Sequence, residues 1–578
     1  MNFEVQWEES AAMCWPAYRN SFAFGHTRAP GMKYTEYQVD TAGSIASHRF
    51  MSICDALLTP YNMLWSKIKA NDDDLMKDRT VALYYNQVTT ALWNARYRAE
   101  ANFYSQNQLN WQSLGVFGNN GMFIDELDSR PMAKRPGLRY MSTSPGEMYK
   151  LKNHQGRTDG FIRHFRWTAR QVHQKWPDKT PAMILAALEK SDNNTRWDIL
   201  HFCLPNGEYD PVKVFDWKGK PYASVYLAVA GQCILERGGY RSFPWPNGGY
   251  SSAPEEDYDR GPAQMVLPDL KTLNSEAAMF LQQGHRAATP AYLIADDGLT
   301  NLKLEPNAKN YGGMNSDGRP LAAPLATGNI QVTPELMARS EKAVNDAFLI
   351  SYFPSLVDDK GGQKSVRQVI EEANERGVFL APALSRQYGE YLAMTIDREL
   401  DLMSFQAAGR SDEERKALGM LPRMPPALRE AQGDYQTIYC SPLARALAGQ
   451  RIVGYMRTVE FAKDVVEITS DPSLMDRFDF DEALPSMADD QFVPPEWMAS
   501  KEQIASKAKD RAAQQKAEND IKALPGQAAM AKAAAIQSKA QTGGNIGGTL
   551  SGTPQGGMPM MPGQAQPGGR AFGQPGQQ

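Results

Sequence analysis

Two stretches with helical spacing of apolar residues flank a short segment rich in glycine, asparagine and proline near the middle of the chain. The first stretch runs over about 268–288, and its apolar residues form one stripe: Leu270, Leu273, Ala277, Leu281 and Ala288. The second, residues 333–353, opens with Thr333, a good N-cap, and Pro334, which suits the first helical position. At 1.5 Å per residue each helix would be roughly 30 Å long. We expect two matched helices that run out and back, with a small head between them.

The length of the chain requires more than one folded unit. At roughly 150 residues per domain, 578 residues predict three or four units, and a hydrophobic fraction of 42% is enough to bury their cores. Residues 526–578 differ, because they consist largely of Gly, Gln, Pro and Met with a single aromatic residue, Phe572. We expect this tail to be disordered.

The remaining patterns predict helices first and strands second. Apolar spacing favours helices over 43–70 and 77–103, whereas 121–245 holds short β-prone runs such as GFIRHFRW, WDILHFCL and VKVFDW. The run ASVYLAVAGQCIL (223–235) is interpreted as a buried strand. A long helix with a break near Gly377 and Pro382 follows, and another helix begins after Ser441. The fold class expected is mainly α with β-rich portions.

Motifs for catalysis or cofactor binding are absent from the sequence. It has no G-x-x-x-x-G-K-[ST] loop, no H-E-x-x-H pair and no G-x-S-x-G elbow. Its five cysteines are scattered, which argues against a zinc site or a disulfide framework and favours a reducing cytosol. We expect no enzyme activity, no cofactor and no metal.

The charge and hydropathy of the chain limit its partners. A net charge of -4 gives no overall basic footprint for gripping nucleic acid. The most apolar stretch is shorter than the roughly 20 residues that a membrane-spanning helix needs, and the start of the chain has no signal-peptide pattern. We expect no membrane association and no export.

Four segments, in order, resemble the head-to-tail connector, or portal, proteins of short-tailed bacteriophages. RGPAQMVLPDLKTLN (260–274) is similar to the signature of that family, and residues 39–65, 144–172 and 439–446 resemble its other motifs, the last as YCSPLARA. The resemblance covers roughly residues 5–450. Two positions depart from the family pattern: Asp259 stands where glycine is common, and Tyr61 stands where a second proline often follows Leu-Thr-Pro.

The resemblance implies a ring, usually of twelve copies, at one vertex of the capsid in the virion, assembled from chains made in the host cytoplasm. Double-stranded DNA would pass through its centre. Further partners would be terminase, then tail adaptor or nozzle proteins, together with the major capsid and scaffolding proteins. The implied regions are wing 1–260, stem helix 261–289, clip 290–330, stem helix 331–353, tunnel loop 354–364, wing kinked helix 365–430, crown 431–525 and tail 526–578.

Two sets of residues carry the expected contacts of such a ring. The tunnel loop and the start of the next helix would face DNA through Asp358, Asp359, Lys360, Lys364 and Arg367. The stem stripe of Leu270, Leu273, Ala277 and Leu281 would lie between subunits. Each set has a plain alternative: the charged residues are an ordinary solvated face, and the stripe is core packing within one subunit. For the whole chain, the alternatives are an enzyme fused to a scaffold and another phage capsid or tail structural protein without a DNA channel.

Overall fold

The computed structural model describes the chain over a set of ranges, and all structural statements below refer to them. They are residues 2–22, 31, 33–76, 78–127, 136–192, 194–294, 303, 305, 308–311, 313–314, 316–325, 333–353, 380–430, 435–469, 477–480, 483–484, 487, 499 and 503–515. The chain divides into two compact units, Met1–Pro495 and Glu496–Gln578. In the second unit, residues 503–515 form a helix.

Helices from the first part of the chain build the main hydrophobic core. The helices are α1 (Asn2–Cys14), α2 (Ala42–Leu58), α4 (Arg79–Arg96) and α5 (Phe103–Phe117), with the short α3 (Asp73–Met76) before α4. Helix α2 packs on α5 with Phe50 fully buried, and a Cβ on Gly115 would lie only 2.7 Å from the Phe50 ring. The glycine is therefore what allows these two helices to approach so closely.

The expected helix over 43–70 is wrong in its second half. Helix α2 ends at Leu58, shortly before Pro60, and Ser66–Ala70 is strand β1. Strand β1 pairs antiparallel with β12 (Tyr435–Tyr439), a partner far away in the sequence. Its residues alternate between buried and half-buried, the period of a strand. The spacing of apolar residues favoured a helix here, and tertiary pairing decides otherwise.

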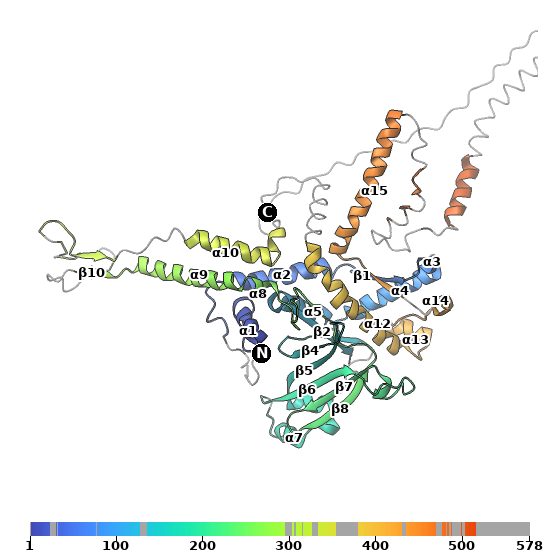
Figure 1. The fold of residues 1–578 in the computed structure, drawn as a ribbon, viewed down its shortest axis with the longest axis horizontal. Helices are drawn as coiled ribbons and strands as arrows, with labels where there is room; N and C mark the ends of the chain where they lie inside the picture. Colours follow the sequence, from blue (N-terminus) through green and yellow to red (C-terminus); the bar gives the residue numbers. More distant parts are fainter. Residues whose placement is uncertain are drawn as a thin grey trace, which may run out of the picture. The chain divides into compact units, whose positions relative to one another are not determined.

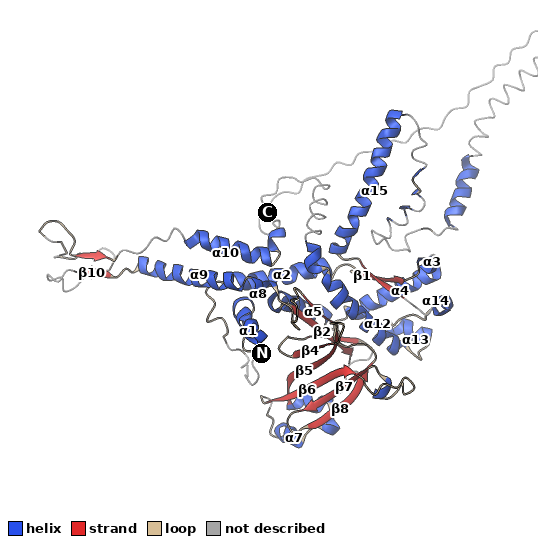
Figure 2. Ribbon diagram, viewed as in Figure 1, coloured by secondary structure: helices blue, strands red, loops and turns tan. Residues whose placement is uncertain are grey.

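The β-rich part consists mainly of a five-stranded antiparallel sheet in the order β4-β5-β6-β7-β8 (Figure 2). Its strands are Met148–Lys152, Thr158–Thr168, Arg196–Pro205, Tyr222–Ala228 and Cys233–Tyr240. Helices α6 (Ala169–Lys175) and α7 (Ala182–Glu189) bury Val172 and Ile184 in one core with Phe165 and Ile199 of the sheet. A smaller sheet has the order β3-β2-β9, formed by Leu138–Ser142, Asn119–Glu126 and Asn247–Gly249.

Two of the predicted strands are corrected by this sheet. The run VKVFDW is not a strand: it lies in turns that lead to a 3-10 helix at Trp217–Gly219. The run ASVYLAVAGQCIL is two strands, β7 and β8, separated by a turn over 229–232. Gly231 and Gln232 in that turn have φ values of 87° and 48°, which an uninterrupted strand does not allow.

The two long helices that flank the central segment are present. Helix α8 (Pro262–Met265) leads into α9 (Leu267–Ala288), and α10 (Thr333–Ala347) packs beside α9 (Figure 1). Between them, β10 (Tyr292–Ile294) and β11 (Ala322–Pro324) form a short antiparallel hairpin. Helix α10 ends earlier than expected, because Leu349 takes a left-handed φ of 62° before a 3-10 turn at Ile350–Tyr352.

The later part of the chain is helical. Residues 380–387 lead into a π-helical turn at Tyr388–Leu392, then α12 (Ala393–Ala407), α13 (Asp412–Leu418), α14 (Pro426–Glu430) and α15 (Pro442–Thr469). Pro382 lies inside the helical stretch, and Gly377 lies outside the described residues. Helix therefore dominates a mixed fold, as the sequence predicts. Within the part of the chain described, no helix is both long enough and apolar enough to span a bilayer.

Candidate functional site

The segment that enters the α9–α10 pair crosses the end of α5 at very short range. Arg260 bridges to Ser251, and Gly261 then precedes α8. A Cβ on Gly261 would lie 2.6 Å from the backbone nitrogen of Gly118 and 2.8 Å from the Leu114 carbonyl oxygen. Backbone atoms cannot move aside for a side chain, so this crossing requires glycine. The Arg-Gly-Pro motif therefore marks a backbone crossing that fixes where α8 and then α9 begin.

Pro262 and Pro268 divide this entry into two helices. Pro262 occupies the first turn of α8, where the Gln264 side chain accepts a hydrogen bond from the Gly261 N–H at 2.9 Å. Pro268 occupies the first turn of α9. A proline ring fits the first turn of a helix, because the N–H it lacks has no partner there in any case. The two prolines therefore mark the starts of two successive helices, the short α8 and the long α9.

Asp259 is held from three sides at the same crossing. Its backbone N–H donates to Asn119 Oδ1 at 3.1 Å, its carbonyl accepts from Asn119 Nδ2 at 2.8 Å, and its carboxylate lies 3.2 Å from Arg386. A Cβ on Gly249 would lie 1.7 Å from the Asp259 carboxylate, so the missing side chain of that glycine makes room for it. Asp259, where the family commonly has glycine, is thus accommodated by its surroundings.

The helix that carries Arg386 connects this crossing with two further elements. Gln387 accepts a hydrogen bond from Asn120 Nδ2 and donates one to the Gly249 carbonyl, both at 2.8 Å. The Tyr388 hydroxyl, at the start of the π-helical turn, hydrogen-bonds Ser441 just before α15. We call this set of residues the stem-entry network: Asn119, Asn120, Asp259, Arg386, Gln387, Tyr388 and Ser441. It ties together the segment before α8, the helix after residue 380 and the start of α15.

A buried ion pair supports the same helix further along. Arg96 of α4 donates from Nε to Glu399 Oε1 at 3.0 Å, and the Tyr140 hydroxyl donates to the same oxygen at 2.6 Å. The Arg96 guanidinium also lies over the Trp65 ring, 4.2 Å from its centre. Burial and the Glu399 carboxylate together raise the pKa of Tyr140 well above its ordinary value, so the phenol stays a hydrogen-bond donor.

Titratable side chains of the described residues form no metal-binding group, and three buried thiols have raised pKa values. No group of three or more His, Cys, Asp or Glu side chains is placed to hold a metal ion in the parts that the structure describes. Burial raises the pKa of the Cys14, Cys203 and Cys440 thiols to about 12, which keeps them protonated and weakly nucleophilic at neutral pH.

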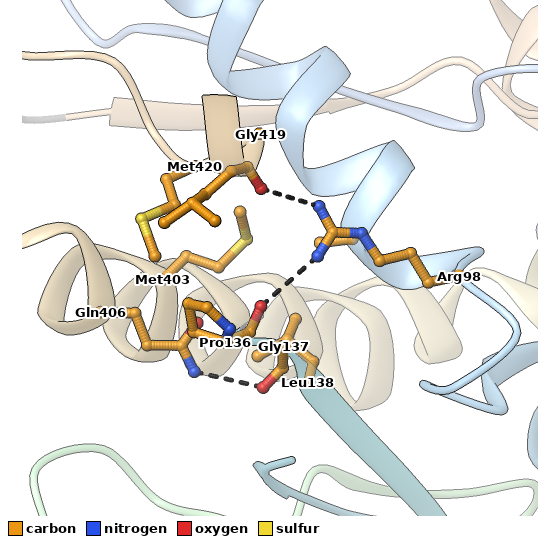
Figure 3. Close-up of a pocket in the computed structure, with 10 residues that line it drawn as sticks. Arg98, Pro136, Gly137, Leu138, Met403, Gln406, Gly419 and Met420 are labelled. Atoms are coloured by element: carbon orange, nitrogen blue, oxygen red, sulfur yellow. Dashed lines mark hydrogen bonds between the residues drawn. The ribbon is translucent and has the colours of Figure 1, made fainter. Parts of the chain in front are cut away.

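A small cavity between Arg98 and Met403, with an accessible volume of about 10 Å³, has room for about one water molecule (Figure 3). Arg98 donates to the Leu418 and Pro136 carbonyls at 3.1 and 3.4 Å, and Gln406 donates to the Gly137 carbonyl at 3.2 Å (Figure 3). These polar groups are used in joining chain segments, so the cavity is a packing feature.

Part of the stem stripe is buried within a single chain and part of it is exposed. Leu270 and Leu273 are each 3% exposed and Ala277 is 8% exposed, whereas Leu281 is 54% exposed. The first three are buried without any neighbouring subunit, which favours core packing for them. Met279 and Phe280, which the sequence analysis did not single out, are exposed beside Leu281. A role for any of these side chains between subunits stays a prediction.

The residues expected to face DNA cannot be placed. Asp358, Asp359, Lys360, Lys364 and Arg367 all lie outside the described residues, as do the whole expected tunnel loop and the tail after 526. The sequence analysis missed the stem-entry network, apart from noting Asp259. Two residues could have indicated this network in the sequence: Gly261 and the unusual Asp259. A required glycine such as Gly261 indicates that another segment of the backbone packs directly against it.

Curated portal proteins of two bacteriophages are similar to this chain. The portal protein of Salmonella phage epsilon15 is 27% identical over 514 residues, covering 87% of each chain. The probable portal protein of Bordetella phage BPP-1 is 22% identical over 511 residues, covering 86% of this chain and 85% of its own.

Solved structures with some likeness come from gene transfer agent (GTA) particles. The neck of an empty GTA particle computed with C6 symmetry has a TM-score of 0.32 and 15% identity, covering 69% of this chain and 96% of that chain. The neck of the native particle computed with C12 symmetry has the same TM-score and identity, covering 67% and 92%.

The family model described as bacteriophage head to tail connecting protein matches residues 1–498. This match spans most of the chain, including every element that meets at the stem entry. The chain therefore belongs to the family of bacteriophage head to tail connecting proteins.

Proposed function

We propose that this chain is the subunit of a closed portal ring at one capsid vertex, through which double-stranded DNA is packaged and later ejected. The observation that carries the proposal is the family match over residues 1–498, together with portal proteins as similar relatives over nearly the same length. The subunit acts structurally and has no catalytic role. Twelve copies form the ring through head-to-tail side contacts, in which two different faces of each chain meet.

The exposed outer half of α9 supports contacts between subunits. Met279, Phe280 and Leu281 are 63%, 40% and 54% exposed, so three consecutive apolar side chains face away from the chain's own core. Residues 279–281 of a closed ring lie against the next stem, which covers them. The stem is then formed by 261–289 and 331–353, and the clip by 290–330.

The remaining regions take the roles that a portal ring needs. Residues 1–260 and 365–430 form the wing, 431–525 form the crown, and 526–578 form a tail. The clip docks terminase during packaging and tail adaptor or nozzle proteins afterwards, while the major capsid and scaffolding proteins surround the ring in the virion.

Residues 354–364 form a tunnel loop that faces the duplex. Asp358 and Asp359 beside Lys360 and Lys364 mix both signs of charge, and Arg367 follows at the start of the next helix. Strong phosphate contacts would hold DNA in place, because each one releases counterions and adds affinity. Mixed charges let the phosphates slide, in keeping with a net charge of -4.

Imaging of the purified chain by electron microscopy tests the ring directly. We expect closed rings with a central hole about as wide as a DNA duplex, and a native mass that corresponds to twelve copies. An intact fold that stays monomeric at micromolar concentration would contradict the proposal. Rings without a hole of that width would favour another capsid or tail structural protein.

Deletion of Asp359–Gly362 tests the tunnel loop separately. We expect an unchanged ring yield in size-exclusion chromatography and a lower amount of DNA per capsid. The ring yield serves as the internal control for folding. If both quantities are unchanged, or if only the ring yield falls, the loop does not face DNA.

A further inference from the structure

A π-helical turn interrupts the helix that leads from residue 380 to the end of α12. In this turn, Tyr388–Leu392, the Ala393 N–H donates to the Tyr388 carbonyl five residues earlier, whereas an α-helix bonds four residues back. The turn therefore contains one residue more than an α-helical turn. Each residue of an α-helix advances the chain by about 100° around the axis, so the residues before the turn are rotated by that angle.

This rotation aims two side chains at the stem entry. Gln387 is completely buried, and it accepts from Asn120 Nδ2 and donates to the Gly249 carbonyl, both at 2.8 Å. Its neighbour Arg386 lies 3.2 Å from the Asp259 carboxylate. In an uninterrupted α-helix these side chains would point about 100° away from their partners. The contacts that hold the segment before α8 thus depend on the extra residue of the turn.

Tyr439, the last residue of β12, supports the turn directly. Its hydroxyl donates to the Tyr388 carbonyl at 2.6 Å, and the centres of the two rings lie 4.3 Å apart. Burial raises the pKa of Tyr439 above its ordinary value, so the phenol keeps the proton that it donates. On the exposed side of the turn, Gly389 has open space around the position of a Cβ. The support therefore comes from the side of β12.

The residues after Tyr439 begin α15 and bind the same turn. Ser441 Oγ hydrogen-bonds the Tyr388 hydroxyl, and the Ala444 N–H donates to Ser441 Oγ at 3.3 Å in the first turn of α15. Tyr388 thus connects the start of α15, through both its hydroxyl and its carbonyl, with the turn that aims Gln387.

The loss of one contact in this series weakens the next. Without the Tyr439 hydroxyl the turn favours the ordinary α-helical pattern more strongly, and any step toward that pattern moves Gln387 and Arg386 off their partners. A complete change of register would also take Leu384, which is fully buried, out of the core, so it occurs only as a rare local opening. The contacts at the two ends should therefore open and close as one unit.

We propose that the π-helical turn couples the start of α15 to the stem entry, with Tyr439 as the positioning residue that holds the turn. The role of this coupling rests on the proposed function, because α15 begins the proposed crown and the segment before α8 leads into the proposed stem. In the assembled ring, a partner that displaces the start of α15 would loosen the grip on the stem entry without contacting the stem.

Hydrogen–deuterium exchange of the purified full-length chain, followed by mass spectrometry, tests this coupling. Tyr439→Phe removes the hydroxyl and keeps the ring stack. Tyr435→Phe is the matched control on the same strand, because its hydroxyl donates to Asp397 Oδ1 at 2.7 Å, outside the turn. The distant reporter is the Arg260 N–H, which donates to the Ser251 carbonyl at 2.8 Å.

We expect Tyr439→Phe to raise the exchange rate of the Arg260 N–H roughly fivefold, as for the loss of one net hydrogen bond. Tyr435→Phe should leave that rate at the wild-type value. A merely local role of Tyr439 would speed exchange only in peptides from 388–393 and 435–441. The distant reporter therefore separates coupling from local support.

A change at the other end tests the same coupling in reverse, because a coupling free energy between two sites is reciprocal. Asp259→Asn keeps the shape of the side chain and removes the charge that faces Arg386. We expect faster exchange of the Arg445 N–H, which donates to the Ser441 carbonyl at 2.9 Å in the first turn of α15. This variant also keeps the inference testable if Tyr439→Phe destabilises the whole chain.

Peptides from β5 and β6 report on global stability, and ring yield is measured on the same samples by size-exclusion chromatography. An Arg260 reporter that does not respond to Tyr439→Phe, or that responds equally to Tyr435→Phe, would overturn the coupling, and so would a rise of equal size in β5 and β6. With wild-type rings present, such a result leaves the proposed function intact. A wild type that forms no rings would count against the proposed function, while exchange still decides the coupling within a single chain.

Discussion

Two leucines on α9, Leu273 and Leu281, separate packing within one subunit from contact between subunits. Leu273 is 3% exposed and Leu281 is 54% exposed. Burying a leucine fully stabilises a fold by about 1.5 to 3 kcal/mol, and placing an unpaired charge in the same site adds a cost of several kcal/mol. We therefore expect Leu273→Asp to lower the free energy of unfolding by about 4 kcal/mol or more.

Leu281→Asp should behave differently. At a half-exposed site the change should alter the stability of one chain by less than about 0.5 kcal/mol. If the side chain lies between stems, however, a charge appears at every contact of the ring, and assembly should fail. Ile234→Asp on β8 is the matched control, because Ile234 is also 54% exposed and lies away from the stem.

Thermal unfolding by circular dichroism and ring yield by size-exclusion chromatography distinguish these cases. We expect a lower unfolding temperature only for Leu273→Asp and, among the chains that fold normally, a loss of rings only for Leu281→Asp. Normal rings with Leu281→Asp would refute the assignment of this side chain to an interface. Unchanged stability with Leu273→Asp would refute the packing of α9 described above.

Three further predictions concern the stem entry, the buried ion pair and the five-stranded sheet. Gly261→Ala should cost about 1 to 3 kcal/mol of unfolding free energy, because its Cβ meets backbone atoms, whereas Gly284→Ala, with open space around it, should be neutral or stabilising in thermal unfolding. Arg96→Met should cost about 3 to 5 kcal/mol, because it leaves the Glu399 carboxyl buried without its ion-pair partner, and adding Glu399→Leu should restore part of this loss. A double-mutant cycle in denaturant that shows no coupling between the two positions would contradict this. Burial, with the positive charges of Arg163 and Lys175 nearby, lowers the pKa of His201 well below 6.5. Below pH 6.5 this histidine is therefore protonated in the unfolded chain while it stays neutral in the folded chain. Stability should fall as the pH drops below 6.5, by up to about 1.4 kcal/mol per unit, and His201→Phe should remove this part of the slope in unfolding measured from pH 7 to 5.

The elements that the sequence predicted well are those whose signal is local. Helix α9 has an apolar stripe, a proline in its first turn and no competing pattern, so its bounds were close to those observed. The run VKVFDW has strand propensity, yet Asp210 and Pro211 before it and Asp216 within it favour turns, and the turns prevail. Propensity within six residues could not reveal that the ends of this loop are joined.

Features that depend on distant partners could not be predicted in the same way. Strand β1 becomes a strand because β12 pairs with it, and the stem-entry network joins Asn119, Asp259 and Arg386, which share no local pattern. The same limit applies to the stem stripe, since periodicity shows that a helix face is apolar but not whether its own chain or a neighbour covers it. Family resemblance supplied the function, which no single motif of the chain encodes.

The pairing of β1 with β12 has a consequence for biosynthesis. Tyr435 leaves the ribosome 365 residues after Ala70, its partner. At 5 to 20 residues per second, β1 waits roughly 20 to 70 s for that partner. During this time the unpaired edge of β1, and later also the apolar residues of α9, are present on the nascent chain before β12 can pair with β1. Premature contact between neighbouring nascent chains on one messenger is then a competing reaction, and slow translation before residue 435 should increase aggregation rather than ring yield.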